Sequence, residues 1–126
     1  MEPKANVLII TVDSDDLASK IAETLISKRL AACVQQVPIK SHYRWEGKVQ
    51  CDKEILLFVK TSVGAVNDAI AAIEKIHTYD LPEIIAMPVL DGSDAQFSNT
   101  PTALCAGARK YDNMSGLLNL SARISR

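Results

Sequence analysis

The chain has 126 residues, of which 48% are hydrophobic and 23% charged, and its formal net charge is -1. These values predict one soluble globular domain, and they give neither the basic field that nucleic acid requires nor a basic patch for an anionic membrane. The chain has no apolar run of membrane-spanning length and no signal-peptide pattern before its first strand, so we expect a cytoplasmic protein. Three cysteines without a Cys-x-x-Cys pair argue against a disulfide scaffold or a zinc knuckle.

The start of the chain predicts a strand followed by a helix. Residues 7–12 are a continuous aliphatic run, which is typical of a buried strand. The acidic cluster 13–16 supplies an N-cap oxygen, and from Leu17 apolar residues recur at helical spacing over roughly fourteen residues. Lys28 and Arg29 near the end of this pattern suit the negative terminus of a helix.

Residues 32–60 predict one long, protruding hairpin. Apolar and polar residues alternate before residue 46, and Glu46-Gly47-Lys48 is a turn signal. Residues 54–60 form the strongest strand pattern of the chain. We expect Pro38 to mark a bulge or a bend in the first arm, because proline lacks the N–H donor of a regular ladder.

A second amphipathic helix follows the hairpin. Apolar residues repeat at helical spacing from Val66 to Ile76, and the pattern ends at His77. The hydroxyl of Thr61 or Ser62 can cap the start of this helix.

The last strand follows a polar junction. Pro82 cannot continue a helix and favours an extended residue before it. The aliphatic run 84–87, which Pro88 follows, is typical of a strand buried on both faces. A helix-to-strand junction can hold functional groups on a rigid frame, and three residues of this one are candidates: His77, Tyr79 and Glu83.

The element order is strand, helix, strand, strand, helix, strand. It predicts an α+β, ferredoxin-like fold, in which an antiparallel sheet carries both helices on one face. Two helices leave the other face uncovered, although residues 7–12 and 55–59 are apolar on both sides, so we expect a closed homo-oligomer. Tyr43 and Trp45 share one face of the hairpin, where we interpret them as aromatic anchors at a subunit interface.

Four sequence blocks resemble the CutA family of divalent-ion tolerance proteins: 29–34 (Arg-Leu-Ala-Ala-Cys-Val), 43–48 (Tyr-Arg-Trp-Glu-Gly-Lys), 56–61 and 77–88. The resemblance implies a ferredoxin-like domain, residues 5–97, in a stable homotrimer similar to that of PII signalling proteins. It also implies a role in tolerance of copper and other divalent ions, with no settled enzymatic activity and no ion required for folding. Residues 98–126 do not match the family and are interpreted as a divergent C-terminal segment or tail.

The resemblance carries over to the metal ligands only in part. Some members have a cysteine at the end of the first strand and two histidines before the turn, whereas here Thr11 replaces the cysteine and only His77 matches. Copper favours sulfur or several imidazoles, so a site must also recruit Cys33, His42, Glu83 or ligands of a neighbouring subunit. The alternatives are a buried core thiol for Cys33 and a plain helix C-terminus for His77.

A small set of polar residues is expected to line a cleft between subunits: Arg44, Lys60, Tyr79 and Glu83. They are expected to bind a small anion or metabolite, or else to pair with each other. The predicted function is therefore a trimer that binds a metal ion weakly in such clefts. The alternatives are a PII-like signalling trimer that binds an anionic metabolite and a trimeric scaffold for a protein partner. We predict no enzymatic activity, because the sequence has no nucleophile-base motif, glycine-rich phosphate loop or revealing carboxylate pair.

Overall fold

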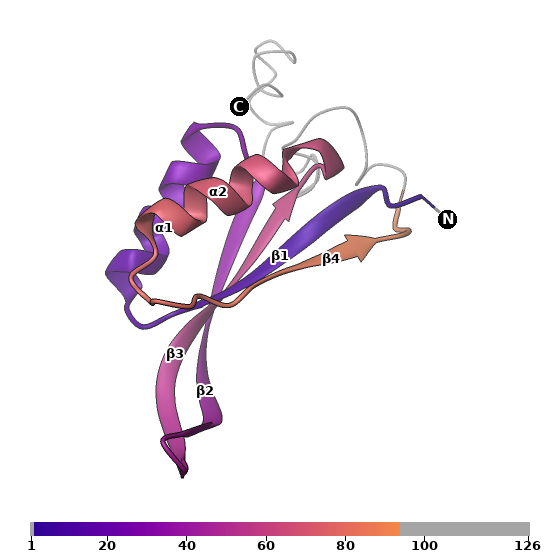
Figure 1. Cartoon of the computed structure of the whole chain (residues 1–126). Coiled ribbons are helices and arrows are strands. Elements are labelled where there is room, and N and C mark those ends of the chain that lie inside the picture. Colours follow the sequence, from indigo (N-terminus) through magenta and orange to yellow (C-terminus); the bar gives the residue numbers. More distant parts are fainter. Residues whose placement is uncertain (1, 94–126) are drawn as a thin grey trace.

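The computed structural model describes residues 2–93 (Figure 1). Its elements are β1 (Ala5–Val12), α1 (Asp15–Ser27), β2 (Cys33–Trp45), β3 (Lys48–Thr61), a 3-10 turn η1 (Val63–Ala65), α2 (Val66–Ile76) and β4 (Ile84–Val89). The predicted order of strands and helices is confirmed. The predicted C-terminal segment, residues 98–126, lies outside the described residues.

The four strands form one sheet in the order β2-β3-β1-β4, and every neighbouring pair is antiparallel. Both helices cover the same face of this sheet (Figure 1). β1 ends at Val12, which pairs with Ile55, so none of the other described strands pairs with the part of the β2–β3 hairpin beyond Glu54. The predicted protruding hairpin is therefore confirmed, and Figure 1 shows it extending past the helices.

The core lies between the sheet and the two helices and is aliphatic. Alternate residues of β1 and β3 face the helices, since side chains of a strand point to opposite faces in turn. The largest fully buried aliphatic residues come from all these elements: Leu8, Ile10, Val12, Ile21, Leu25, Leu57, Val59 and Ile73.

Helix α1 begins as predicted. The Ser14 Oγ accepts a hydrogen bond from the Leu17 N–H at 3.1 Å, and Asp15 and Asp16 lie in the first turn. Its end also agrees with the prediction, because the basic residue Lys28 is the C-cap. Arg29 follows the helix with a left-handed φ of 60°. This conformation is costly for a residue with a Cβ atom.

The hairpin has a tight left-handed turn at its tip and a proline in its first arm. Glu46 and Gly47 have φ values of 50° and 80°, as two-residue turns between antiparallel strands require, so the predicted turn is confirmed. Pro38 pairs with Ile55 in an unbroken register, so the predicted bulge is wrong. β2 is an edge strand, where a missing N–H donor is tolerated when it faces away from the sheet.

The predicted cap of α2 is wrong. Thr61 ends β3, and its hydroxyl donates a hydrogen bond to the Leu30 carbonyl at 2.6 Å. Ser62 precedes the 3-10 turn and makes no capping bond through its side chain. The reason is the short η1 turn, which separates both hydroxyl groups from the first residue of the α-helix.

Strand β4 is not buried on both faces within one subunit, in contrast to the prediction. It lies at the edge of the sheet, and Ile85 and Met87 are 48% and 45% exposed. They share the helix-free face with half-buried residues of the two central strands, which alternate with core residues: Val7, Ile9, Leu56 and Phe58. The predicted aliphatic face that neither helix covers is therefore present among residues 2–93.

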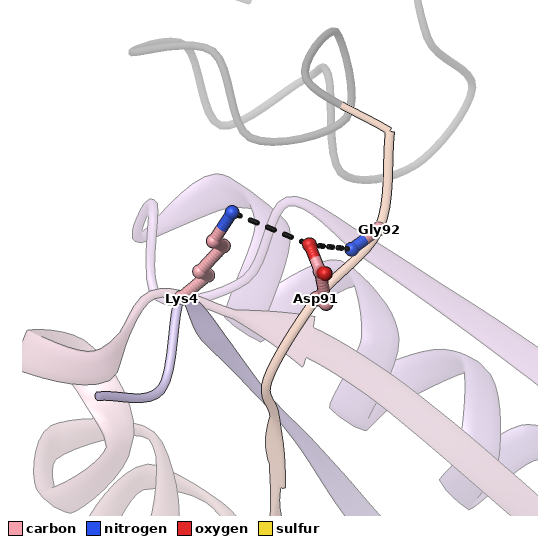
Figure 2. Close-up of polar contacts among 3 residues, drawn as sticks. All are labelled: Lys4, Asp91 and Gly92. Carbon is pink, nitrogen blue, oxygen red and sulfur yellow. Dashed lines mark hydrogen bonds and ion pairs between the residues drawn. The ribbon is translucent and has the colours of Figure 1, made fainter. Parts of the chain in front are cut away.

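The two ends of the described chain meet at one corner of the sheet. The Lys4 N–H donates to the Val89 carbonyl at 2.8 Å, and the Lys4 ammonium lies 3.4 Å from Asp91 Oδ1. Figure 2 shows that the same Asp91 oxygen accepts the Gly92 N–H. These two interactions lower the pKa of the exposed Asp91 carboxyl, with the Gly92 hydrogen bond contributing most.

Candidate functional site

His77 joins the end of α2 to the end of β1. It is the C-cap of α2, and its backbone N–H donates to the Ile73 carbonyl at 2.9 Å. The ring Nε2 lies 2.8 Å from the Thr11 carbonyl oxygen, which can only accept, so Nε2 carries the proton. The ring Nδ1 then accepts the Tyr79 N–H at 3.1 Å.

This hydrogen bonding decides what His77 can do in a single subunit. A metal ion binds to a free lone pair of neutral imidazole. In His77 one nitrogen carries a proton and the lone pair of the other accepts a hydrogen bond. An ion could therefore bind here only by replacing the bond to Thr11 or the bond to Tyr79.

Tyr79 connects the same junction to the root of the hairpin. Its ring lies tilted against the His77 ring, with centroids 4.7 Å apart, and its hydroxyl donates to Glu54 Oε2 at 2.6 Å. Partial burial and the hydrogen bond to Glu54 raise the pKa of Tyr79 well above its ordinary value. The sequence analysis missed Glu54, because 25 positions separate it from Tyr79 and no local pattern links them.

A groove of about 580 Å³ lies beside this network, between the β1–α1 turn and the root of the hairpin. The turn contributes Asp13, Ser14 and Asp15, and the hairpin contributes residues 38–40 and 53–55. Lys40 and Lys53 pair directly across the two strands. The carboxylates of Asp13, Asp15 and Glu54 outnumber these two ammonium groups, so the groove of one subunit does not favour an anionic ligand.

The predicted metal ligands do not meet within one subunit. Cys33 is buried at the start of β2 and pairs with Lys60, which pairs with Val7, whereas His77 binds the carbonyl of Thr11. Val7 and Thr11 are four residues apart along β1, a distance of roughly 13 Å. Among residues 2–93, no three or more His, Cys, Asp or Glu side chains are grouped so that they could hold a metal ion.

The other predicted ligand, Glu83, is exposed in the residue before β4. The predicted ligand-cleft residues are also spread along the sheet. Arg44 pairs with Val49 near the hairpin turn, and Lys60 lies eleven residues further along β3, roughly 36 Å away. Arg44 and Lys60 therefore cannot line one cleft unless separate subunits supply them.

The predicted interface aromatics lie on the free part of the hairpin. Trp45 is 62% exposed, and Tyr43 is also exposed. The Tyr43 hydroxyl donates to the Asp52 carboxylate, and this hydrogen bond raises the pKa of Tyr43. Neither ring packs in the core, which leaves both available to a neighbouring molecule.

None of the helices among residues 2–93 is long and apolar enough to span a membrane.

Comparison with known proteins gives a consistent result. Residues 6–98 match the family described as CutA1 divalent ion tolerance protein. The chain is 44% identical over 88 residues to the divalent-cation tolerance protein CutA of Thermus thermophilus, a match that spans 85% of that protein. It is 43% identical to the chloroplastic protein CutA of Arabidopsis thaliana over 89 residues, which make up 49% of that longer protein.

Solved structures agree with the sequence matches. The divalent cation tolerance protein from Thermus thermophilus superposes with a TM-score of 0.67 at 43% identity, covering 71% of this chain and 87% of that one. The periplasmic divalent cation tolerance protein CutA from Archaeoglobus fulgidus gives a TM-score of 0.71 at 35% identity, covering 74% and 91%. On this evidence the chain belongs to the CutA1 divalent ion tolerance protein family.

Proposed function

We propose that the protein acts as a homotrimer in tolerance of divalent metal ions and that it binds such an ion weakly in clefts between its subunits. Membership of the family and the names of the relatives support the tolerance role. The relatives are named for tolerance rather than for a reaction, so the proposed role is not enzymatic. The strand order and the two helices on one face support a ferredoxin-like subunit. The proposed location is the cytoplasm.

The observation that carries the trimer is the helix-free face of the sheet. Apolar residues of β1, β3 and β4 are half-buried or exposed there, and neither α1 nor α2 covers them. Apolar surface of this extent is stabilised by contact with a like surface, because each square ångström removed from water contributes about 25 cal/mol. In a closed, symmetric oligomer every subunit buries this apolar face in the same way. The exposed Tyr43 and Trp45 would anchor the hairpin against a neighbour.

The same geometry supports a weak site between subunits. We propose copper as the ion, with His77 and Glu83 as ligands that two subunits supply together. The sulfur of Cys33 is disulfide-bonded, so Cys33 can join these ligands only after reduction. His77 must give up one hydrogen bond before it can bind, which costs about 1 kcal/mol. Glu83 is exposed and can reach a neighbouring subunit.

The first test is the mass of the native assembly, measured by native mass spectrometry and sedimentation with and without copper. We expect a trimer in both conditions. Ile85→Lys on the helix-free face should dissociate it, because a lysine there cannot pack against another sheet. Ile26→Lys, at a similarly exposed position of α1, is the matched control and should leave the trimer intact. A native chain that sediments as a folded single subunit would refute the trimer.

The second test is calorimetric titration with Cu²⁺. It uses a Cys51→Ser background, because the exposed Cys51 thiol would otherwise compete for copper. His77→Ala and Glu83→Gln should each weaken binding by about tenfold or more, as loss of a ligand requires. Unchanged binding in His77→Ala would remove His77 from the site.

A further inference from the structure

His42 and Cys51 form a sulfur–nitrogen pair on the free part of the hairpin. They are directly opposite each other in the β2–β3 ladder. The Cys51 Sγ lies 3.7 Å from the His42 Nε2, and both side chains are exposed. Since the ladder holds the backbones of two directly paired residues close together, the two ligand atoms are brought together before any ion binds. The pair lies outside the junction and the groove described above.

The separation of the two atoms fits a metal ion between them. Zinc binds a cysteine sulfur at about 2.3 Å and a histidine nitrogen at about 2.0–2.1 Å. These bond lengths place the sulfur and the nitrogen about 3.6 Å apart at a tetrahedral angle and about 3.8 Å apart at a trigonal angle. The 3.7 Å in the structure lies between these two values, so an ion can enter with little movement of either side chain.

We propose that Cys51 and His42 form a binding site for Zn²⁺ or a similar divalent ion of borderline softness. The thiolate and the neutral imidazole are the ligands that such ions prefer. On binding, the S–H proton of Cys51 leaves to solvent, and the sulfur and the His42 Nε2 each donate a lone pair without any change of oxidation state. Water fills the remaining coordination positions, as in zinc sites that keep open positions.

The pair stays accessible in the proposed trimer. Side chains alternate along each strand, so His42 projects from the face of the hairpin opposite to Tyr43 and Trp45. Packing through the two aromatic residues therefore leaves His42 and Cys51 free. The site is independent of the proposed inter-subunit cleft, because it uses neither His77 nor Glu83.

The charges around the pair predict how its affinity should change. Lys40 and Lys53 pair with each other two positions along the ladder, on the same face as His42 and Cys51. Their positive charge opposes a divalent cation, although solvent and salt screen exposed charges. Lys53→Gln should therefore tighten Zn²⁺ binding or leave it unchanged.

The experiment is a calorimetric titration of the full chain with Zn²⁺ at neutral pH, repeated in buffers of different ionisation heat to count the protons released. We expect one ion per subunit with release of the thiol proton. Cys51→Ser should abolish binding, and His42→Gln should weaken it by about tenfold or more. His77→Gln is the control that should bind like the native chain. Alkylation of Cys51, followed by peptide mass spectrometry, should be slowed by Zn²⁺ in the native chain and much less in His42→Gln.

The outcomes separate this proposal from the inter-subunit site. Native affinity in Cys51→Ser or in His42→Gln would overturn the hairpin site, as would no Zn²⁺ uptake by the native chain. Loss of Zn²⁺ binding in His77→Gln alone would also overturn it and would favour the cleft. Loss in the two hairpin variants, with copper binding in the Cys51→Ser background unaffected by His77→Ala, would support the hairpin site and remove His77 from the cleft site.

Discussion

The hydrogen bond between Tyr79 and Glu54 gives the sharpest test of the junction. Its donor–acceptor distance of 2.6 Å is typical of a hydroxyl that donates to a carboxylate. Such bonds contribute about 1.5–3 kcal/mol to stability when buried. Because Tyr79 is only half-buried, we lower the expected coupling to about 1 kcal/mol.

The assay is a double-mutant cycle with Tyr79→Phe, Glu54→Gln and the double variant, unfolded by denaturant at one fixed protein concentration, because assembly shifts apparent stability. Each single variant should be destabilised by about 1 kcal/mol, or roughly 4–8 °C in Tm for a domain of this size. The double variant should lose little more unfolding free energy than either single variant. If the two single effects simply add, Tyr79 and Glu54 do not interact and the reasoning is refuted.

The raised pKa of Tyr79 gives the same pair a pH dependence. Folding keeps the Tyr79 proton at pH values where the unfolded chain releases it, so this contribution is fully present below about pH 10, the ordinary tyrosine pKa. It is lost as pH rises further toward the raised pKa of the folded state. The native chain should therefore lose stability above about pH 10 more steeply than Tyr79→Phe. Parallel curves for the two proteins would contradict this assignment.

Three further predictions concern stability. Arg29→Gly should raise the free energy of unfolding by up to about 1 kcal/mol, because glycine relieves a left-handed φ that costs other residues about 1–2 kcal/mol. Lys20→Gly, at an exposed position of α1, should instead lower it by about 1 kcal/mol. A less stable Arg29→Gly variant would contradict the strain. Ile21→Ala removes a fully buried side chain and should cost about 2–5 kcal/mol in chemical denaturation, whereas a loss below about 1 kcal/mol would show a core that refills. Asp91→Asn should reduce the stability that the chain loses between about pH 5 and about pH 2. The lowered pKa of the Asp91 carboxyl stabilises the fold above the unfolded pKa, and this contribution disappears as pH falls. The same acid dependence of stability in both proteins would show that the contacts of Asp91 with Lys4 and Gly92 do not stabilise the fold.

Local patterns predicted the elements of the fold well. The Ser14 cap and the left-handed turn at Glu46 and Gly47 depend on neighbouring residues alone, so the sequence contains all the information they need. The turn also sets the register of the hairpin, and counting outward from it pairs His42 with Cys51. That signal was present in the sequence, although the sequence analysis did not use it.

Contacts between distant parts of the chain could not be predicted in this way. The His77–Thr11 bond joins residues 66 positions apart, and it determines which ring nitrogen carries the proton. β4 is exposed because it lies at the edge of the sheet. Its aliphatic sequence predicts burial and does not reveal this position. Among residues 2–93 the side chains of Ile85 and Met87 remain about half exposed.

The two outer strands each carry a proline, Pro38 in β2 and Pro88 in β4. Proline has no backbone N–H donor, so a strand from another molecule that pairs with either edge strand lacks one hydrogen-bond partner there. Growth into long fibrils by repeated strand addition is thereby discouraged at both borders. In the proposed trimer, association instead uses the helix-free apolar face, which is fully occupied once the ring of subunits has closed.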